Sequence, residues 1–320
     1  MKLINQSAQY LPQQAGIDGI YKQIELAGRT SYLSWDKMTD DSANKFMDML
    51  IKSKHYSVLE QGTIYLNIGN NLYDTEFEHD ACKWNLFIQK YRENPYSKLA
   101  HNTHIDGASI TTNLRVLQEN GWLDDLKYFC EPTEFHEKRL SVKVVTSRGI
   151  SHELVRHRSM SFIQESQRYV EYTKDRFEGE ITYIIPHWLD FKEGKYYRDT
   201  LDGFYVWTCD GEYVNTQSEN RGGTLFLSLL NQAEYFYKRF CSIEYNLKPQ
   251  QARDILPNAT KTTLVITAFE SDWRDWFDKR LFSKTGQPHP DMLVLANLIK
   301  QEFEKAGVWE GIIKYPSKYE

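Results

Sequence analysis

The chain has 320 residues, of which 41% are hydrophobic and 14% aromatic, enough apolar material for a large buried core. Its formal net charge of −5 excludes the overall cationic surface that attracts nucleic acids or membranes, so any anion site must be a local basic cluster. The sequence has no charged-then-apolar leader, no apolar run of about 20 residues and no Cys-x-x-Cys pair, which predicts a globular, cytoplasmic protein with reduced thiols.

The first predicted elements form a unit of two helices and a strand. Asp18 is expected to cap a helix over 19–28, and Ser42 a second helix that reaches toward Lys54. Polar and apolar residues alternate from Thr63 to Ile68, which is the pattern of a half-buried strand.

The remaining elements follow from periodicity, proline, glycine and capping residues. Residues 69–108 lack a clear period and predict a surface insertion with a short helix near 82–92, and the aromatic, charged and glycine-punctuated residues 188–221 predict a second insertion. The other expected elements are a helix over 110–119, a strand over 140–145, a helix capped by Ser151, a strand over 182–185, a helix over 222–245, a helix from Pro249 to Pro257, a strand over 264–269, a helix from Ser271 to Arg280, and a helix from Pro290 to Gly307. No linker divides the chain, so we expect a single domain, 1–320.

The densest polar cluster is Arg156-His157-Arg158-Ser159-Met160-Ser161-Phe162-Ile163-Gln164-Glu165-Ser166-Gln167-Arg168-Tyr169. Three guanidinium groups, an imidazole, two amides and three serine hydroxyls form a donor set suited to phosphates and the edge of a base. A basic helix end that complements the helix dipole is the alternative interpretation. The cluster predicts a nucleotide ligand.

Other familiar sites are not supported. His152 and His157 are five residues apart, so they would lie on different faces of a helix and could not share the metal of a zinc protease. No Gly-x-Gly-x-x-Gly follows a strand, no phosphate-binding P-loop is present, and Ser161 and Ser166 lack a nucleophile-elbow setting. His101 and His104 lack a nearby cysteine or acid and are expected to be solvated, so no metal site is predicted.

Several segments, in order along the chain, resemble the flavin-dependent thymidylate synthases, the ThyX class. They are the Ala27-Gly28-Arg29-Thr30-Ser31-Tyr32 segment, the His55-Tyr56-Ser57-Val58-Leu59-Glu60 turn, the Arg156 to Tyr169 cluster with its lead Ser151-His152-Glu153-Leu154-Val155, the Ala252-Arg253-Asp254-Ile255-Leu256-Pro257 segment, and Trp273 to Arg280 followed by His289-Pro290. The resemblance implies an α/β (α+β) fold of the ThyX kind, with a mostly antiparallel sheet flanked by long helices and interrupted by the two insertions.

The resemblance also implies an activity: FAD, NADPH and methylenetetrahydrofolate convert dUMP to dTMP in a homotetramer whose sites lie between subunits, without nucleic acid or membrane partners. Residue by residue, it assigns flavin contacts to His55 and Ser57 from a neighbouring subunit, and to Arg156, His157, Arg158, Gln164 and Asp275. It assigns dUMP contacts to Glu153, Arg156, Ser166, Gln167, Arg168 and Arg253, and the catalytic position beside the pyrimidine to Arg280.

Three positions depart from the family pattern. Phe269-Glu270-Ser271 stands where many members have Asn-x-Arg, Asp275 stands where an Asn is common, and Gln287 or His289 takes the place of a His after Arg280. Alternatives are therefore a ThyX-like pyrimidine nucleotide hydroxymethylase, a dCMP-acting variant, or a non-catalytic nucleotide-binding protein. Arg253 and Arg280 could also form internal salt bridges, with Asp254 and Asp278 respectively.

Overall fold

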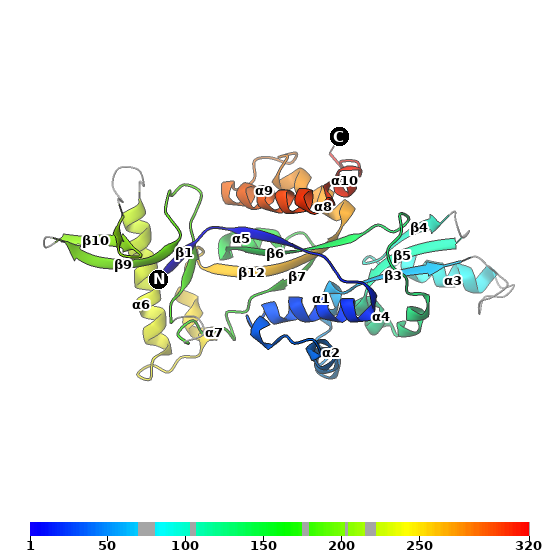
Figure 1. Ribbon diagram of the computed structural model, residues 1–320, viewed down its shortest axis with the longest axis horizontal. Coiled ribbons are helices and arrows are strands. Elements are labelled where there is room, and N and C mark those ends of the chain that lie inside the picture. The colour runs from blue at the N-terminus through cyan, green and yellow to red at the C-terminus, as the bar shows by residue number, and fades with distance from the viewer. Residues whose placement is uncertain (70–80, 103–106, 175–178, 202–203, 215–221, 320) are drawn as a thin grey trace.

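In the computed structural model, the described residues are 1–69, 81–102, 107–174, 179–201, 204–214 and 222–319. Three sheets follow one another along the long axis of the molecule (Figure 1). The fold is α+β with mostly antiparallel pairing, as expected, although the strands form three sheets where one was predicted. No helix among these residues is long and apolar enough to span a membrane.

The central sheet has the strand order β2-β6-β12-β7 and is antiparallel throughout. Its strands are β2 (Ser7–Leu11), β6 (Arg139–Ser147), β7 (Ser161–Gln164) and β12 (Lys261–Phe269). β6 and β12 pair over nine residues, from Lys261 opposite Ser147 to Phe269 opposite Arg139. Eight of the nine β12 residues are buried, because helices cover both faces of the sheet.

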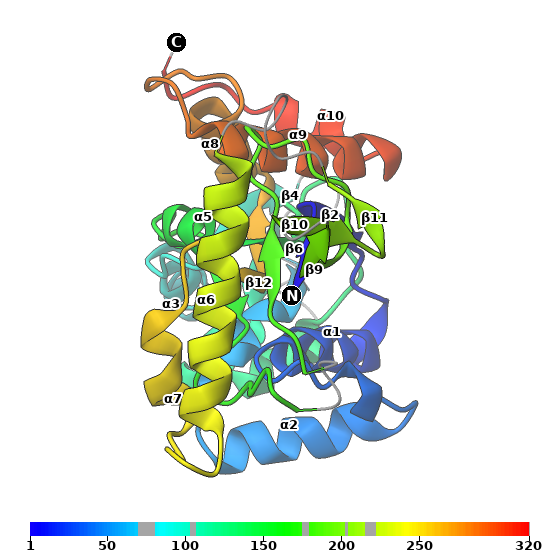
Figure 2. The ribbon, with the colours of Figure 1, turned by 90° about the vertical axis from the view of Figure 1, so that its left-hand side faces the viewer.

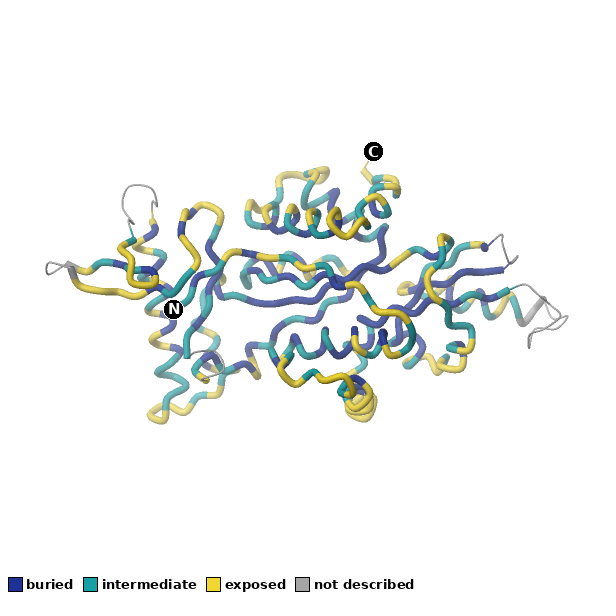
Figure 3. Tube along the Cα trace, viewed as in Figure 1, coloured by how far each residue is buried: buried dark blue, intermediate teal, exposed yellow. Residues whose placement is uncertain are grey.

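One face of the central sheet is covered by α5, α8 and α9, with α10 packed against α8 and α9; the other face is covered by α1, and α2 packs against α1 on the side away from the sheet (Figures 1 and 2). These helices are α1 (Gly16–Thr30), α2 (Ser42–Lys52), α5 (Arg148–Leu154), α8 (Glu270–Arg280), α9 (Pro290–Lys305) and α10 (Trp309–Ile313). Alternate residues of β12 serve the two faces: Leu264 and Ile266 join the α8 side, and Val265 the α1 side. Exposed residues lie mainly on the outer helices and loops (Figure 3).

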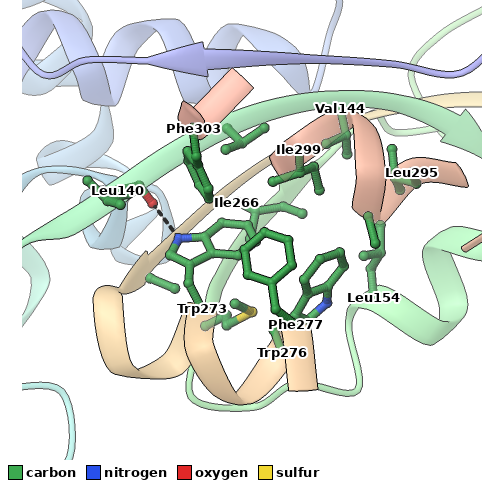
Figure 4. Packing of buried hydrophobic residues seen from close by; sticks show 14 of the residues in the cluster. Leu140, Val144, Leu154, Ile266, Trp273, Trp276, Phe277, Leu295, Ile299 and Phe303 are labelled. Carbon is green, nitrogen blue, oxygen red and sulfur yellow. Dashed lines mark hydrogen bonds between the residues drawn. The ribbon is translucent and has the colours of Figure 1, made fainter. Parts of the chain in front are cut away.

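The core beneath α8 is dominated by aromatic rings (Figure 4). Trp273, Trp276 and Phe277 are at most 1% exposed, and Phe303 of α9 meets two of them with ring centroids 5.2 Å (Trp273) and 6.1 Å (Phe277) apart. Trp273 Nε1 donates a 3.0 Å hydrogen bond to the Leu140 carbonyl, which satisfies its one polar atom. α8 is thereby fixed to both β6 and α9.

Two lobes flank the centre. One contains the sheet β3-β5-β4, formed by β3 (Thr63–Ile68), β4 (Lys98–Asn102) and β5 (Gly107–Asn113), with helices α3 (Ala81–Arg92) and α4 (Leu114–Asn120). The other contains β1 (Lys2–Ile4), β8 (Thr182–Ile184), β9 (Gly194–Leu201), β10 (Phe204–Cys209) and β11 (Glu212–Tyr213), with α6 (Gly223–Cys241) and α7 (Pro249–Ala252). Short 3₁₀ turns are Trp35–Lys37, Tyr56–Gln61, Leu123–Tyr128 and Arg253–Ile255.

The two predicted insertions supply folded elements. Residues 69–108 contribute α3, β4 and the start of β5, and Ile88 and Tyr91 are buried in that lobe's core, so this segment is not confined to the surface. Residues 188–221, which gave no pattern, supply β9, β10 and β11. His101 is exposed, and His104 lies outside the described residues.

The predicted strands at Thr63, Leu140, Thr182 and Leu264 are confirmed. The predicted helix over 110–119 is wrong in its first half, because the chain continues as β5 to Asn113. The Asn113 side chain accepts from Val116 N and so begins α4. The helix expected from Pro249 to Pro257 is α7 followed by a 3₁₀ turn.

The four predicted N-caps are also wrong. The N-cap positions belong to Ala15, Asp41, Ser147 and Phe269, in place of Asp18, Ser42, Ser151 and Ser271. Ser147 accepts from Ile150 N, whereas the Ser151 hydroxyl is occupied by the Arg148 carbonyl and the Gln164 amide. For Ser151, these competing partners of the hydroxyl, which the local sequence does not reveal, explain the shift.

Candidate functional site

The candidate site forms where α5 and α8 meet. α5 follows β6 at the Ser147 end of the β6–β12 ladder, and α8 follows β12 at the opposite end, so the two helices run toward each other across the sheet. Their last turns bring together Glu153 and Arg280, which are 127 residues apart in sequence. Arg280 Nη1 lies 2.9 Å from Glu153 Oε2, and Nη2 donates to the Glu153 carbonyl at 3.3 Å.

The third contact of Arg280 is to His157. Arg280 Nε donates to His157 Nε2 over 3.1 Å, so that nitrogen must carry a lone pair. Burial, reinforced by the charges of Arg280 and Lys279, lowers the pKa of His157 to about 4. At neutral pH the imidazole is uncharged and its Nδ1 carries the proton, which leaves a donor for a ligand.

His157 should make stability depend on pH. Below its ordinary pKa of 6.5 an unfolded histidine takes up a proton, whereas folded His157 does so only near 4. Between these values the unfolded state binds more protons, so this residue lowers stability as pH falls. The His157→Gln free energy of unfolding should therefore vary less between about pH 4.5 and about pH 6.5 than that of the wild type, measured by urea titration. Equal pH dependence of the two proteins would contradict the assignment of a neutral His157.

A pocket of about 540 Å³ opens beside this contact. It is lined by Arg156, His157, Arg158, Ser159, Asp275, Lys279, Arg280, Thr285, Gly286, Gln287 and Pro288, and we call it the arginine pocket. Three arginines and a lysine face one acid, Asp275. Such a surplus of planar and ammonium donors suits a phosphate-bearing ligand.

A second pocket, of about 860 Å³, lies between α1, α2 and the chain after β7. Its lining includes His55 and Tyr169 together with several serines, and we therefore call it the serine pocket. The serines are Ser31, Ser34, Ser42, Ser53, Ser57 and Ser166. The residues predicted to hold one flavin are thus divided between two pockets of a single chain.

The other predicted site residues line neither pocket. Gln164 donates to Ser151 Oγ and Thr262 Oγ1 at 2.9 and 3.2 Å, while Gln167 is buried. Arg168 is exposed and stacks over the Tyr169 ring, 5.3 Å from its centroid. Glu153 also lines a smaller cavity of about 350 Å³.

The internal salt bridges suggested for the two downstream arginines do not form. Arg280 pairs with Glu153, whereas Asp278 lies 3.4 Å from Arg274. In the described part of the chain, Arg253 has no carboxylate within ion-pair distance, Asp254 included.

Two further arginines, which the sequence did not single out, donate hydrogen bonds to residues of the basic cluster. Arg139 donates to the Glu60 carbonyl at 2.9 Å and to Ser161 Oγ at 3.0 Å. Burial lowers its pKa to about 10, so it stays charged at neutral pH. Arg148 donates to the Glu165 carbonyl at 3.3 Å. Their positions near the two ends of a predicted strand were the only available signal.

Glu270, one of the departures from the family pattern, does not line the arginine pocket. It is 3% exposed, and Lys314 Nζ lies 3.4 Å from its Oε2. Burial raises its pKa despite that lysine. The acid therefore joins α8 to the segment after α10.

Most of the residues described above lie within a segment that matches a known protein family. The family model described as thymidylate synthase complementing protein, Thy1, matches residues 93–306, which include the basic cluster, Arg253 and Arg280.

The chain is also similar in sequence to individual proteins named as flavin-dependent thymidylate synthases. A probable flavin-dependent thymidylate synthase of Paramecium bursaria Chlorella virus 1 is 28% identical over 176 residues, 53% of this chain and 68% of the viral protein. The flavin-dependent thymidylate synthase of Corynebacterium efficiens is 32% identical over 147 residues, 42% of this chain and 46% of its own length. Among solved structures, the UMP/dUMP methylase PolB from Streptomyces cacaoi, bound with 5-Br dUMP, covers 98% of both chains at 13% identity and a TM-score of 0.44.

Proposed function

Because this chain belongs to the family of thymidylate synthase complementing proteins, we propose that it is a flavin-dependent thymidylate synthase that converts dUMP to dTMP. The observation that carries the proposal is the arginine pocket, in which Arg156 to Ser159 of the basic cluster and Arg280 lie together within the family match. Methylenetetrahydrofolate would donate the carbon, and NADPH the reducing equivalents.

The residues present fit FAD. Two phosphates bring several negative charges that Arg156, Arg158 and Lys279 can neutralise, and neutral His157 can donate one further hydrogen bond. When bound, the flavin supplies the redox chemistry. The chain's own contribution is to bind, orient and stabilise charge.

We also propose that each site is completed by a neighbouring copy in a homotetramer. The support is the division of predicted flavin residues: His55 and Ser57 line the serine pocket, whereas Arg156 and His157 line the arginine pocket. A second copy that placed its serine pocket beside the arginine pocket would bring these residues to one flavin.

The substrate is proposed to lie with its phosphate toward Ser166, Gln167, Arg168 and Arg253, and its pyrimidine toward Glu153 and Arg280. Of the three cysteines whose side chains are described, none lines either pocket, and burial raises the pKa of Cys130 to about 11. A thiolate nucleophile is therefore not part of the proposal. Arg280 would instead stabilise the negative charge that develops on the pyrimidine when hydride reaches C6.

The test is FAD titration of the purified protein, followed by mass analysis of the product from dUMP, methylenetetrahydrofolate and NADPH. We expect flavin binding and a methylated product. A hydroxymethylated product, or turnover of dCMP in place of dUMP, would replace the proposal with one of the altered chemistries. Binding of dUMP without flavin uptake or NADPH oxidation would identify a non-catalytic protein.

Arg253→Ala should mainly weaken dUMP binding. A phosphate contact acts in both the ground state and the transition state, so the KM for dUMP should rise roughly 10- to 100-fold while kcat stays near the wild-type value. Steady-state kinetics over a range of dUMP concentrations measure both. Arg239→Ala is the matched control, because Arg239 is an exposed arginine of α6 that pairs with Glu244. A fall in kcat with unchanged KM would remove Arg253 from the phosphate site.

A further inference from the structure

The segment after α10, residues 314–319, folds back along α8. Lys314 and Tyr315 contact Glu270, with Lys314 Nζ and the Tyr315 hydroxyl 3.4 and 3.5 Å from its Oε2. Farther along, Tyr319 donates its hydroxyl to Asp275 Oδ1 at 3.1 Å, and Lys318 Nζ lies 3.8 Å from the same oxygen. The segment therefore contacts Asp275, a residue that lines the arginine pocket.

Asp275 is the one acid among the described residues that line this pocket. Its side chain is 14% exposed, and both carboxylate oxygens are engaged: Lys279 Nζ lies 2.6 Å from Oδ2, while Tyr319 and Lys318 share Oδ1. Burial by itself would raise the pKa of Asp275, but the hydrogen bonds and charges of Lys279, Lys318 and Tyr319 hold it below its ordinary value. The group is therefore an anion at neutral pH.

An anion at the wall of a phosphate pocket repels the ligand and competes for its cations. If Lys279 were the one partner of Asp275, the two residues would form a pair of zero net charge, and Lys279 would contribute no net positive charge toward a phosphate. With Lys318 added, the local charge becomes positive, and Tyr319 holds Oδ1 without adding charge. The segment thus offsets an acid that would otherwise oppose binding.

We propose that Lys318 and Tyr319 are positioning residues of the arginine pocket, which act through Asp275 to favour a diphosphate ligand. The inference rests on the proposed function for the identity of that ligand, FAD. The charges of Asp275 and Lys318 would act in the same way on any diphosphate. In a purely structural role, Lys318 and Tyr319 would only hold the segment against α8, as Lys314 does through its ion pair with Glu270.

A double-mutant cycle separates these roles, because Asp275→Asn removes the carboxylate charge 3.8 Å from Lys318 Nζ. Kd for FAD is measured by flavin fluorescence for the wild type, Lys318→Ala, Tyr319→Phe, Asp275→Asn, and Asp275→Asn combined with Lys318→Ala. Lys318 is 65% exposed, so we expect only about a 2- to 5-fold weakening from Lys318→Ala when Asp275 is present, and less at high salt. When Asp275→Asn is already in place, the same change should have a smaller effect, because Lys318 has then lost the carboxylate beside it and contributes only its own screened attraction for the ligand. Lys305→Ala, at an exposed ion pair on α9, is the control.

An equal loss of affinity with and without the Asp275→Asn change, or no loss when Asp275 is present, would overturn the inference. If the wild type does not bind FAD, the proposed function fails, and the same cycle is then run with inorganic pyrophosphate by calorimetry. The coupling between Asp275 and Lys318 should persist there. Its absence, or a wild type that binds neither probe, would overturn the inference as well.

Discussion

Replacing Arg280 by alanine should lower dTMP formation at saturating dUMP by roughly 100-fold or more, the scale of losing one preorganised electrostatic group. Arg280 is fixed on three sides, by the Glu153 carboxylate, the Glu153 carbonyl and His157 Nε2, before any ligand arrives. A cation held in this way needs no reorganisation as charge develops on the substrate. Single-turnover rates of dTMP formation, at matched flavin occupancy, measure the effect.

Arg280→Lys should recover little of this activity, because an ammonium group cannot make the same planar set of contacts to Glu153 and His157. Arg274→Ala is the matched control on the same helix: Arg274 pairs with Asp278, so its loss should lower stability and leave the turnover of folded enzyme unchanged. Near-normal turnover by Arg280→Ala would show that Arg280 serves only as the structural partner of Glu153.

Trp273→Ala should lower the free energy of unfolding by about 3–5 kcal/mol, the usual cost of removing a large buried ring. Trp273 is fully buried, packs against Trp276, Phe277 and Phe303, and donates to the Leu140 carbonyl. The cavity would lie between α8, β6 and α9, where neighbouring elements are already fixed by their own contacts. Chemical denaturation followed by circular dichroism measures the change.

Trp273→Phe separates packing from hydrogen bonding at this position. It keeps an aromatic ring but leaves the Leu140 carbonyl without its partner, so we expect a smaller loss of about 1–3 kcal/mol. Trp188→Ala is the control, because Trp188 is 51% exposed and should cost less than either change. A Trp273→Ala protein as stable as the Trp188→Ala protein would mean that the α8 core does not carry the stability assigned to it.

Two of the four strands of the central sheet, β6 and β12, could be predicted from the sequence because they have strong local patterns, whereas β2 and β7 were not predicted. Alternation at Leu140–Val145 and the apolar run at Leu264–Phe269 each placed a strand that the structure confirms. The helix caps could not be predicted in the same way. Ser151 and Ser42 carry the right hydroxyl, yet each bonds elsewhere, Ser151 to Arg148 and Gln164, and Ser42 to Thr39 and Glu25.

The sequence could predict which residues belong to the candidate site, but it could not predict most of the contacts between them. The basic cluster and Arg280 are visible in the sequence, and Arg156 to Ser159 of the cluster line the arginine pocket together with Arg280. The partner of Arg280 was not, because Glu153 lies 127 residues away and only the antiparallel pairing of β6 with β12 brings it near. Likewise, no local pattern connects Asp275 with Lys318 and Tyr319, which reach it after two intervening helices.

The pairing of β6 with β12 also bears on how the chain can tolerate changes of length. Both segments that meet at Glu153 and Arg280 leave directly from this one ladder, so their separation depends on nine paired residues and two helix lengths. The strands β3, β4 and β5 and the strands β9, β10 and β11 belong to other sheets and are not part of this ladder. Residues can therefore be gained or lost in either lobe without changing the distance between Arg280 and Glu153. One residue added within β12 would instead shift the strand register by one position and reverse which side chains face α8. We therefore expect changes of chain length to be tolerated in the two flanking lobes and not in the β6–β12 ladder.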